Sequence, residues 1–462
     1  MTIKTNTTIP GRVYGAIIAT GLMSFCGVIV ETAMNITFPT LMHEFSVGTN
    51  TVQWMTTIYL LIVASIVPLS AYFKRRFKTR NLFLTANLLF IIGLLLDLTA
   101  PVFPLMLLGR AVQGVGTGIA LPLMFNIILE QVPAAKIGMM MGVGTLITAV
   151  APAIGPTFGG LVVSNMSWRY IFVFLLPLMV ISLITGWLCI QQKTPTEAVK
   201  SDPLSIILVI VAFAGLVFGS SSISSNSFFS LQVLGALVLG AFALAGFSWR
   251  QLRLSTPIID IRVLGNKQFS GHVLAFFLIQ MTALGLSFIL PNYVQLVNNG
   301  SALQAGLLVL PGAALGALLA PFSGRILDRI GARTPILIGI ALATIALFIY
   351  VGLGQHISNF MITGVYLIYM LGIGLGFGNV MTHSLQQLDQ MHQTTGNAIM
   401  NTIQQFAGAL GTALTATLIA AGQNGYSTAI GTAIGAHNAL IMLAVILCCA
   451  LITLTLLLRR HE

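Results

Sequence analysis

The sequence predicts an all-α polytopic membrane protein with fourteen transmembrane helices. Its 462 residues are 56% hydrophobic and only 7% charged, whereas soluble domains carry about 25% charged residues. The hydrophobic residues are gathered in runs of the length that crosses a bilayer, about 20 residues. No soluble fold could bury this much apolar surface, so the chain is expected to lie in lipid.

Fourteen apolar segments qualify as spans, and short polar connections separate them. They cover residues 14–39, 52–73, 81–100, 104–129, 138–163, 168–190, 204–221, 230–248, 269–293, 303–324, 333–353, 358–381, 395–421 and 434–458. Because the number is even, both termini are expected on the same side of the membrane.

Basic residues indicate which side that is, because they cluster in alternate connections and at the two termini. They are Lys4, Arg12, Lys74, Arg75, Arg76, Lys78, Arg80, Lys136, Lys193, Lys200, Arg250, Arg253, Arg262, Lys267, Arg325, Arg329, Arg333, Arg459 and Arg460. The opposite connections hold almost no Lys or Arg, and Arg169 is the main exception. The positive-inside rule therefore predicts that both termini are cytoplasmic.

The two halves of the chain share a pattern. Residues 69–80 follow the second span, and residues 322–333 follow the tenth; both segments are short and basic. If the seventh and eighth spans are set aside, each segment joins the second and third helices of a six-helix half. Internal repeats of this kind are typical of secondary transporters. The pattern predicts an N-terminal bundle over 1–192, two additional helices with linkers over 193–265, and a C-terminal bundle over 266–462.

Five motifs then occur in order along the predicted helices. They are QWMTTIYLL in the second span, GRAVQGVGTG (109–118) in the fourth, GPTFGG (155–160) in the fifth, SWRYIF before the sixth, and GRILDRIGAR (324–333) after the tenth. In this order they resemble the fourteen-helix drug:proton antiporter branch of the major facilitator superfamily, over essentially the whole chain. The resemblance implies the major facilitator fold, with two six-helix bundles and two extra central helices.

The resemblance also implies roles for particular residues. Arg110 matches an arginine linked to proton coupling, and Gln113 and Gly114 complete the helix-four motif. The antiporter motif comprises Pro152, Gly155, Pro156, Gly159 and Gly160, and a cytoplasmic charge lock comprises Gly324, Arg325, Asp328, Arg329 and Arg333. Each set has a simpler interpretation: tight helix packing for the glycines and prolines, extension to the interface for Arg110, and a solvated loop for the charges.

The chain departs from the family pattern in two places. Its first basic loop has Ala71, Arg75 and Lys78 where the family commonly has Gly, Asp and Gly, which puts the lock of the first half in doubt. In the first span, Val30 stands where the family has Asp, and Glu31 is one residue later. This Glu-Thr form, followed by Asn35, resembles a Gram-positive subgroup that includes lincomycin-resistance-type exporters.

Glu31 is the candidate proton carrier. It lies in the apolar run VIVETAMNITFP, and an ionisable residue inside a membrane segment is costly and usually functional. A low-dielectric environment favours the neutral form of a carboxylate, which suits reversible protonation. A helix-packing acid that is hydrogen-bonded to a neighbour is the alternative interpretation.

Polar side chains within the spans are candidates for substrate binding between the two halves. They are Glu31, Asn35, Asn126, Gln280, Asn292, Gln295, Asn379, Asn401 and Gln404. A pocket for varied drugs needs a few such groups among aromatic and aliphatic side chains. An interhelical hydrogen bond is the alternative for each of them.

Together these features predict a proton-coupled multidrug efflux antiporter, which exports amphipathic cationic or neutral compounds by alternating access. A proton-coupled metabolite symporter and a flippase for lipid-linked substrates are the alternatives. No nucleotide-binding loop, metal cluster or nucleophile–base pair suggests an enzyme, so no cofactor is expected and the proton gradient supplies the energy. The expected partners are drugs, protons and the lipid bilayer, not nucleic acid. We expect a monomer in the bacterial cell membrane.

Overall fold

The computed structural model of the chain describes residues 9–35, 37–47, 49–196, 202–223, 226–227, 229–254, 257–423 and 426–458. Its helical segments are α1 (Gly11–Asn35), α2 (Phe38–Glu44), α3 (Thr49–Ile66), η1 (Val67–Leu69), α4 (Ser70–Arg76), α5 (Thr79–Thr99), α6 (Phe103–Gln131), η2 (Ala134–Lys136), α7 (Ile137–Asn165), α8 (Tyr170–Cys189), α9 (Pro203–Ser222), η3 (Leu231–Gly235), α10 (Ala236–Arg253), η4 (Ile261–Gly265), α11 (Lys267–Leu296), α12 (Ala302–Ile330), α13 (Arg333–Leu353), α14 (Asn359–Gln386), α15 (Gln393–Gln423) and α16 (Thr428–Leu458). Within the described residues, fourteen helices are long and apolar enough to cross a membrane, which confirms the predicted number of spans.

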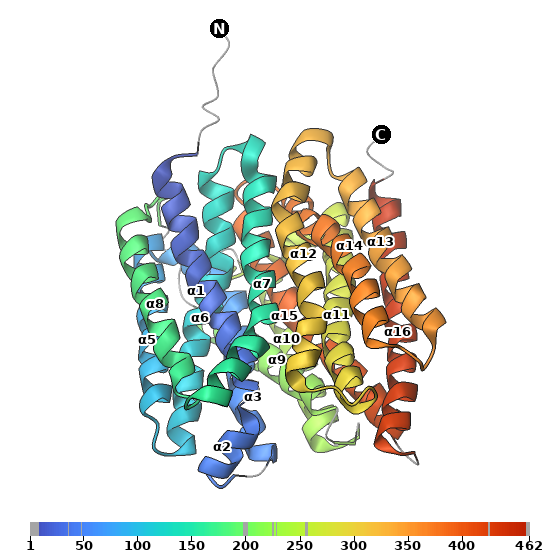
Figure 1. Cartoon of the computed structure of the whole chain (residues 1–462). Helices are drawn as coiled ribbons and strands as arrows, with labels where there is room; N and C mark the ends of the chain where they lie inside the picture. Colours follow the sequence, from blue (N-terminus) through green and yellow to red (C-terminus); the bar gives the residue numbers. More distant parts are fainter. Residues whose placement is uncertain are drawn as a thin grey trace.

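The transmembrane helices form two six-helix bundles and an additional pair (Figure 1). The first bundle contains α1, the single span formed by α3, η1 and α4, and α5 to α8, and the second contains α11 to α16. In the first, α1 packs against α6, α7 and α8; in the second, α11 packs against α14, α15 and α16 in the corresponding way. The predicted domain boundaries at 192/193 and 265/266 fall between α8 and α9 and directly after η4.

The first and last described helices place both ends of the described chain at the same end of this assembly. α1 begins and α16 ends at the top of Figure 1, which we call the terminal face; the opposite end is the distal face. Lys4, Lys200, Arg459 and Arg460, on which the predicted orientation partly depends, lie outside the described residues.

The two bundles meet mainly along α7 and α12, which lie side by side in Figure 1. Glycines allow this approach: the α-carbon of Gly142 faces the backbone of Ala320, and Gly138 faces Gly324. On another side of the assembly, α9 packs against both α3 and α15, and Phe218 of α9 stacks on Trp54 of α3 with ring centroids 5.8 Å apart. One of the two additional helices therefore contacts both bundles.

The first span differs from its predicted extent. It was predicted to continue to residue 39, but α1 ends at Asn35 and the separate helix α2 begins at Phe38. The turn is closed locally, because the Thr37 hydroxyl donates to the Met34 carbonyl at 2.7 Å. Pro39 then lies in the first turn of α2, where the missing N–H of proline costs nothing.

Candidate functional site

Arg110 is the centre of a buried polar network in the first bundle. Its side chain is 0% exposed on α6. Nη1 donates to Gln113 Oε1 at 2.7 Å, and Nε donates to the Met55 carbonyl at 3.3 Å. The guanidinium also lies over the Tyr59 ring, 4.3 Å from its centroid, a favourable cation–π position. Arg110 therefore points into the bundle and does not extend to the membrane surface.

Asp97 completes this network, although the sequence did not suggest that it would. Gln113 uses its Nε2 to donate to Asp97 Oδ2 at 2.8 Å, and Asp97 is 0% exposed. The amide of Gln113 thus joins the buried cation to a buried acid. A sequence signal did exist, because Asp97 follows Phe90 and Gly93 at helical spacing on the buried face of α5.

Tyr59 fixes the position of α1 relative to this network. Its hydroxyl donates to the Gly27 carbonyl at 2.8 Å and lies 2.9 Å from Thr117 Oγ1. Glu31 is four residues after Gly27, so the two share one face of α1. The carboxylate therefore lies on the side of the helix that faces α3 and α6, although Glu31 is shifted by one residue from the family's usual acid position.

Glu31 differs from the rest of the network because it is partly accessible. Its neighbours Val30 and Ala33 are 0% exposed, whereas Glu31 is half-buried. No hydrogen bond between Glu31 and Arg110 is present among the described residues. Glu31 is therefore less buried than Asp97 and Arg110, the other charged groups of this site.

The fifth-span motif holds α7 against α1 beside this acid. Gly155 contacts Thr32, and Gly159 lies against the backbone of Ala33. Gly160, by contrast, faces open space. Pro152 is half-buried, and the side chain of Pro156 is outside the described part of the structure. The contacts of Gly155 and Gly159 place the motif directly against the Glu31 turn of α1.

At the terminal face, Asp328 joins the two bundles. Its carboxylate accepts hydrogen bonds from the backbone N–H groups of Gly138 and Met139, each at 3.0 Å. These groups belong to the first turn of α7, where the helix dipole favours a negative charge. Arginines were the expected partners, but Arg325 lies over the Phe322 ring at 5.6 Å and Arg329 is exposed. The contact made by Asp328 is therefore between a carboxylate and a helix N-terminus.

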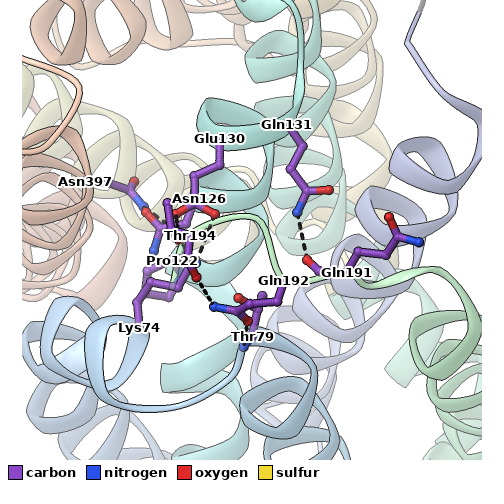
Figure 2. Close-up of polar contacts among 10 residues, drawn as sticks. All are labelled: Lys74, Thr79, Pro122, Asn126, Glu130, Gln131, Gln191, Gln192, Thr194 and Asn397. Carbon is purple, nitrogen blue, oxygen red and sulfur yellow. Dashed lines mark hydrogen bonds and ion pairs between the residues drawn. The ribbon is translucent and has the colours of Figure 1, made fainter. Parts of the chain in front are cut away.

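A chain of asparagine side chains makes a second connection between the bundles (Figure 2). Asn397 of α15 donates to Asn126 Oδ1 at 2.8 Å and to the Pro122 carbonyl at 3.0 Å on α6. Asn401, one turn later, donates to Asn397 Oδ1 at 2.7 Å. Two predicted substrate-contacting residues thus take part in interhelical bonds. Asn397 itself was missed, although its four-residue spacing from Asn401 was visible in the sequence.

Beside this connection, Lys74 and Glu130 form an ion pair of 2.9 Å within the first bundle (Figure 2). Lys74 was expected in a basic loop, but α4 continues to Arg76 and its side chain is only 3% exposed. Thr194 lies 3.3 Å from both Lys74 Nζ and Glu130 Oε1. The segment after α8 is thereby attached to α4 and α6.

Comparison with known proteins decides the family. A model described as the Major Facilitator Superfamily matches residues 20–412. The chain belongs to this superfamily. It is 38% identical over 411 residues to the lincomycin resistance protein LmrB of Listeria innocua, covering 89% of this chain and 87% of that one. It is 37% identical over 411 residues to LmrB of Bacillus subtilis, covering 88% and 86%.

A more distant relative is the multidrug resistance protein B homolog of Mycobacterium tuberculosis, 28% identical over 415 residues, covering 88% of this chain and 76% of that protein. Two solved structures share the fold at 13% identity. The human organic anion transporter MFSD10 has a TM-score of 0.67 and covers 96% of this chain and 100% of that chain. The proton:xylose symporter XylE has a TM-score of 0.61 and covers 94% of each. The major facilitator fold predicted from the motifs is thus confirmed.

One departure from the superfamily pattern has a clear structural counterpart. Arg75 occupies the position where an aspartate is common, and its Nη2 donates to the carbonyls of Pro257 and Ile258, the latter at 3.2 Å. These carbonyls belong to the linker between α10 and η4. The side chains of Leu69, Tyr72 and Ile258 pack in one apolar cluster with residues of α9 and α10. The basic side chain therefore attaches the additional helices to the first bundle.

The remaining candidate substrate residues have different surroundings. Asn379 donates to Ser323 Oγ at 2.6 Å and to the Leu375 carbonyl at 2.9 Å, which joins α14 to α12. Asn292 and Gln295 donate to carbonyls of their own helix. Within the described part of the chain, the side chains of Gln280 and Gln404 make no hydrogen bond; Gln280 is buried and Gln404 is half-buried. The side chain of Asn35 is not among those described.

The distal face explains the exception to the charge pattern. Arg169 Nη1 donates to Glu44 Oε1 at 2.6 Å, and Trp168 Nε1 donates to Glu44 Oε2 at 2.6 Å. Partial burial opposes ionisation of Glu44, but the bonds from Trp168 and Arg169 outweigh it and hold its pKa below the ordinary value. The charge of Arg169 is therefore compensated by a neighbouring carboxylate.

Proposed function

We propose that this transporter exports amphipathic cationic or neutral drugs in exchange for protons, with its terminal face toward the cytoplasm. The observation that carries the proposal is the position of Glu31, a half-buried acid on the same face of α1 as Gly27, whose carbonyl binds Tyr59 beneath the buried Arg110. Relatives named lincomycin resistance and multidrug resistance proteins support the choice of substrate class.

The mechanism follows from the two charges. When Glu31 is neutral, its site offers no attraction to a cation; when Glu31 is ionised, it attracts a cationic drug or Arg110. Uptake of a proton from the distal side and its release to the terminal side would thus alternate with binding and release of drug. Gln280 and Gln404 are proposed to contact the drug by hydrogen bonds, beside the aromatic pair Phe277 and Phe406, whose centroids are 6.0 Å apart. No cofactor is needed, and a monomer is sufficient.

The test is transport of a panel of drugs by purified protein in vesicles with an imposed pH gradient. Glu31→Gln keeps the size of the side chain but cannot titrate, so uphill export should be lost while neutral drugs still bind. Glu31→Asp should keep partial activity, because the carboxylate remains but its reach is shorter. Full gradient-driven export by Glu31→Gln would refute the proton-carrier role.

The same vesicles separate the alternatives. A symporter would move substrate and protons in the same direction, which reverses the sign of the substrate-driven pH change. A flippase would move lipid without any effect of drugs. The proposed orientation predicts cytoplasmic tags at both termini and outside labelling of a cysteine at Ser225, a position beyond the described residues.

A further inference from the structure

Two acids share one buried arginine in the first bundle, and they do so in different ways. Asp97 reaches Arg110 through the amide of Gln113, whereas Glu31 lies on the face of α1 whose Gly27 carbonyl binds Tyr59, the ring beneath Arg110. Within the described residues, Asp97 Oδ1 and Arg110 Nη2 have no hydrogen-bond partner. A buried charge without a compensating charge is costly in free energy. Each acid therefore lowers the free-energy cost of burying the charged Arg110 side chain at its present position.

The orientation of the Gln113 amide depends on both charges. Its oxygen accepts from the guanidinium and its nitrogen donates to the carboxylate. The reversed amide would place NH₂ against a cation and C=O against an anion, and both contacts would be repulsive. Linked hydrogen bonds of this kind polarise one another in a low-dielectric interior, so loss of charge at Asp97 weakens the hold on Arg110.

Close packing of α5 and α6 fixes the geometry of this relay. Gly109 has its α-carbon against the Asp97 carboxylate, and Gly93 lies against Gln113, where an added Cβ would be 2.5 Å from Gln113 Cγ. Larger residues at these glycines would displace the acid or the amide. The structure thus leaves Asp97 little freedom to turn away from its partner.

We propose that Asp97 is a positioning residue that holds Arg110, through Gln113, away from direct pairing with Glu31. This inference rests on the proposed function, in which Glu31 carries the proton. Because Arg110 is hydrogen-bonded to Gln113, which is bonded to Asp97, Arg110 does not pair with Glu31. Glu31 therefore stays available for proton uptake at ordinary pH.

Other charged and titratable groups face this site from the surrounding helices. Tyr59 of α3 lies beneath the guanidinium. Arg169, which precedes α8, donates from Nη2 to the Ala100 carbonyl at 2.9 Å near the end of α5, and its charge is paired with Glu44. Arg169 is paired with the Glu44 carboxylate, so Arg110 is the cation to which Asp97 is connected by hydrogen bonds through Gln113.

The decisive experiment is the pH profile of drug export by Asp97→Asn in vesicles. Asparagine keeps the size of the side chain and an oxygen that can accept from Gln113, but it removes the charge. Arg110 is then left with Glu31, and a nearby cation favours an ionised carboxylate. The midpoint of the profile should move to lower pH by about one unit or more, the size usual for a carboxylate that gains an arginine partner.

Three further variants make the result unambiguous. Asp97→Glu should restore part of the wild-type midpoint. Gln113→Met, which removes the relay at similar size, should give the same acid shift and serves if Asp97→Asn does not fold. Asp389→Asn is the control, because this acid is exposed in a terminal-face turn, with 91% of its side chain accessible.

The outcomes separate the inference from the function on which it rests. If wild-type export ignores the pH gradient, the proposed function fails and this inference with it. If the wild type and Glu31→Gln behave as proposed but a folded Asp97→Asn or Gln113→Met keeps the wild-type midpoint, only the positioning role is refuted.

Discussion

Replacement of Gly159 by alanine should push α1 and α7 apart. A Cβ at this position would lie 2.5 Å from the Ala33 carbonyl oxygen, 3.0 Å from its Cα and 3.1 Å from its carbonyl carbon. All three are backbone atoms, so no rotation of a side chain can relieve the contact. Ordinary van der Waals contacts begin at 3.4 Å, so the two helices must shift relative to one another at this point.

The adjacent glycine supplies a matched control. Gly160 has nothing within 4 Å of its added Cβ, and the same Gly-to-Ala change in the same helix brings the same gain of about 1 kcal/mol in helix propensity. The propensity terms cancel when the two variants are compared. Overpacking alone then separates them, by about 1–3 kcal/mol of unfolding free energy.

The assay is thermal unfolding of the purified variants in detergent, together with drug export in cells. We expect a lower unfolding midpoint and weaker export for Gly159→Ala, and a midpoint equal to or above wild type with normal export for Gly160→Ala. Equal midpoints and equal export for both variants would refute the argument that α7 is held against α1 by the absence of a side chain at Gly159.

Two further predictions concern charges near the membrane surfaces. Hydrogen bonds from Arg250 at 2.7 and 2.9 Å lower the pKa of Asp202 to about 2 from its usual 3.8. Asp202→Asn should therefore lower the unfolding midpoint at pH 7, and the difference in midpoint from wild type should shrink as the pH falls from 4 toward 2. A difference in midpoint that is constant with pH would contradict this reasoning. Asp328→Asn removes a charge whose interaction with the α7 N-terminus is worth about 0.3–1 kcal/mol. Spin labels at the exposed Ala135 and Ile330 should then report a larger population of long label-to-label distances. An unchanged distance distribution would argue against the contact.

The sequence was sufficient for the number of spans and the bundle arrangement, because both depend on properties that are local in the chain. Apolar runs of membrane length define each helix, and the motifs lie at fixed places within the repeat. Where prediction failed, neighbours far along the chain decide the structure. Lys74 was assigned to a solvated loop because it lies among four other basic residues, and its burial depends on Glu130 of another helix.

The charged site shows the same limit. Glu31 and Arg110 were identified from their types and from resemblance, since few ionisable residues occur inside the spans. Asp97 was not predicted, because its role depends on which face of α5 meets α6. The partner of Asp328 could not be found from side-chain types at all, because backbone N–H groups at a helix start carry no residue-specific signal.

The placement of the ion pairs has a consequence for the rate of transport. Lys74–Glu130 and Glu44–Arg169 lie within the first bundle, and Asp202–Arg250 lies within the additional helical pair. None of these three pairs has to break when the bundles separate at the terminal face. Two polar contacts described above do cross: the neutral hydrogen bonds from Asn397 to α6, each worth about 0.5–1.5 kcal/mol, and the Asp328 carboxylate at the α7 N-terminus, worth about 0.3–1 kcal/mol. The ion pairs between side chains thus lie inside the parts that move as units, whereas the polar bonds that join those parts are individually weak enough for thermal motion to break.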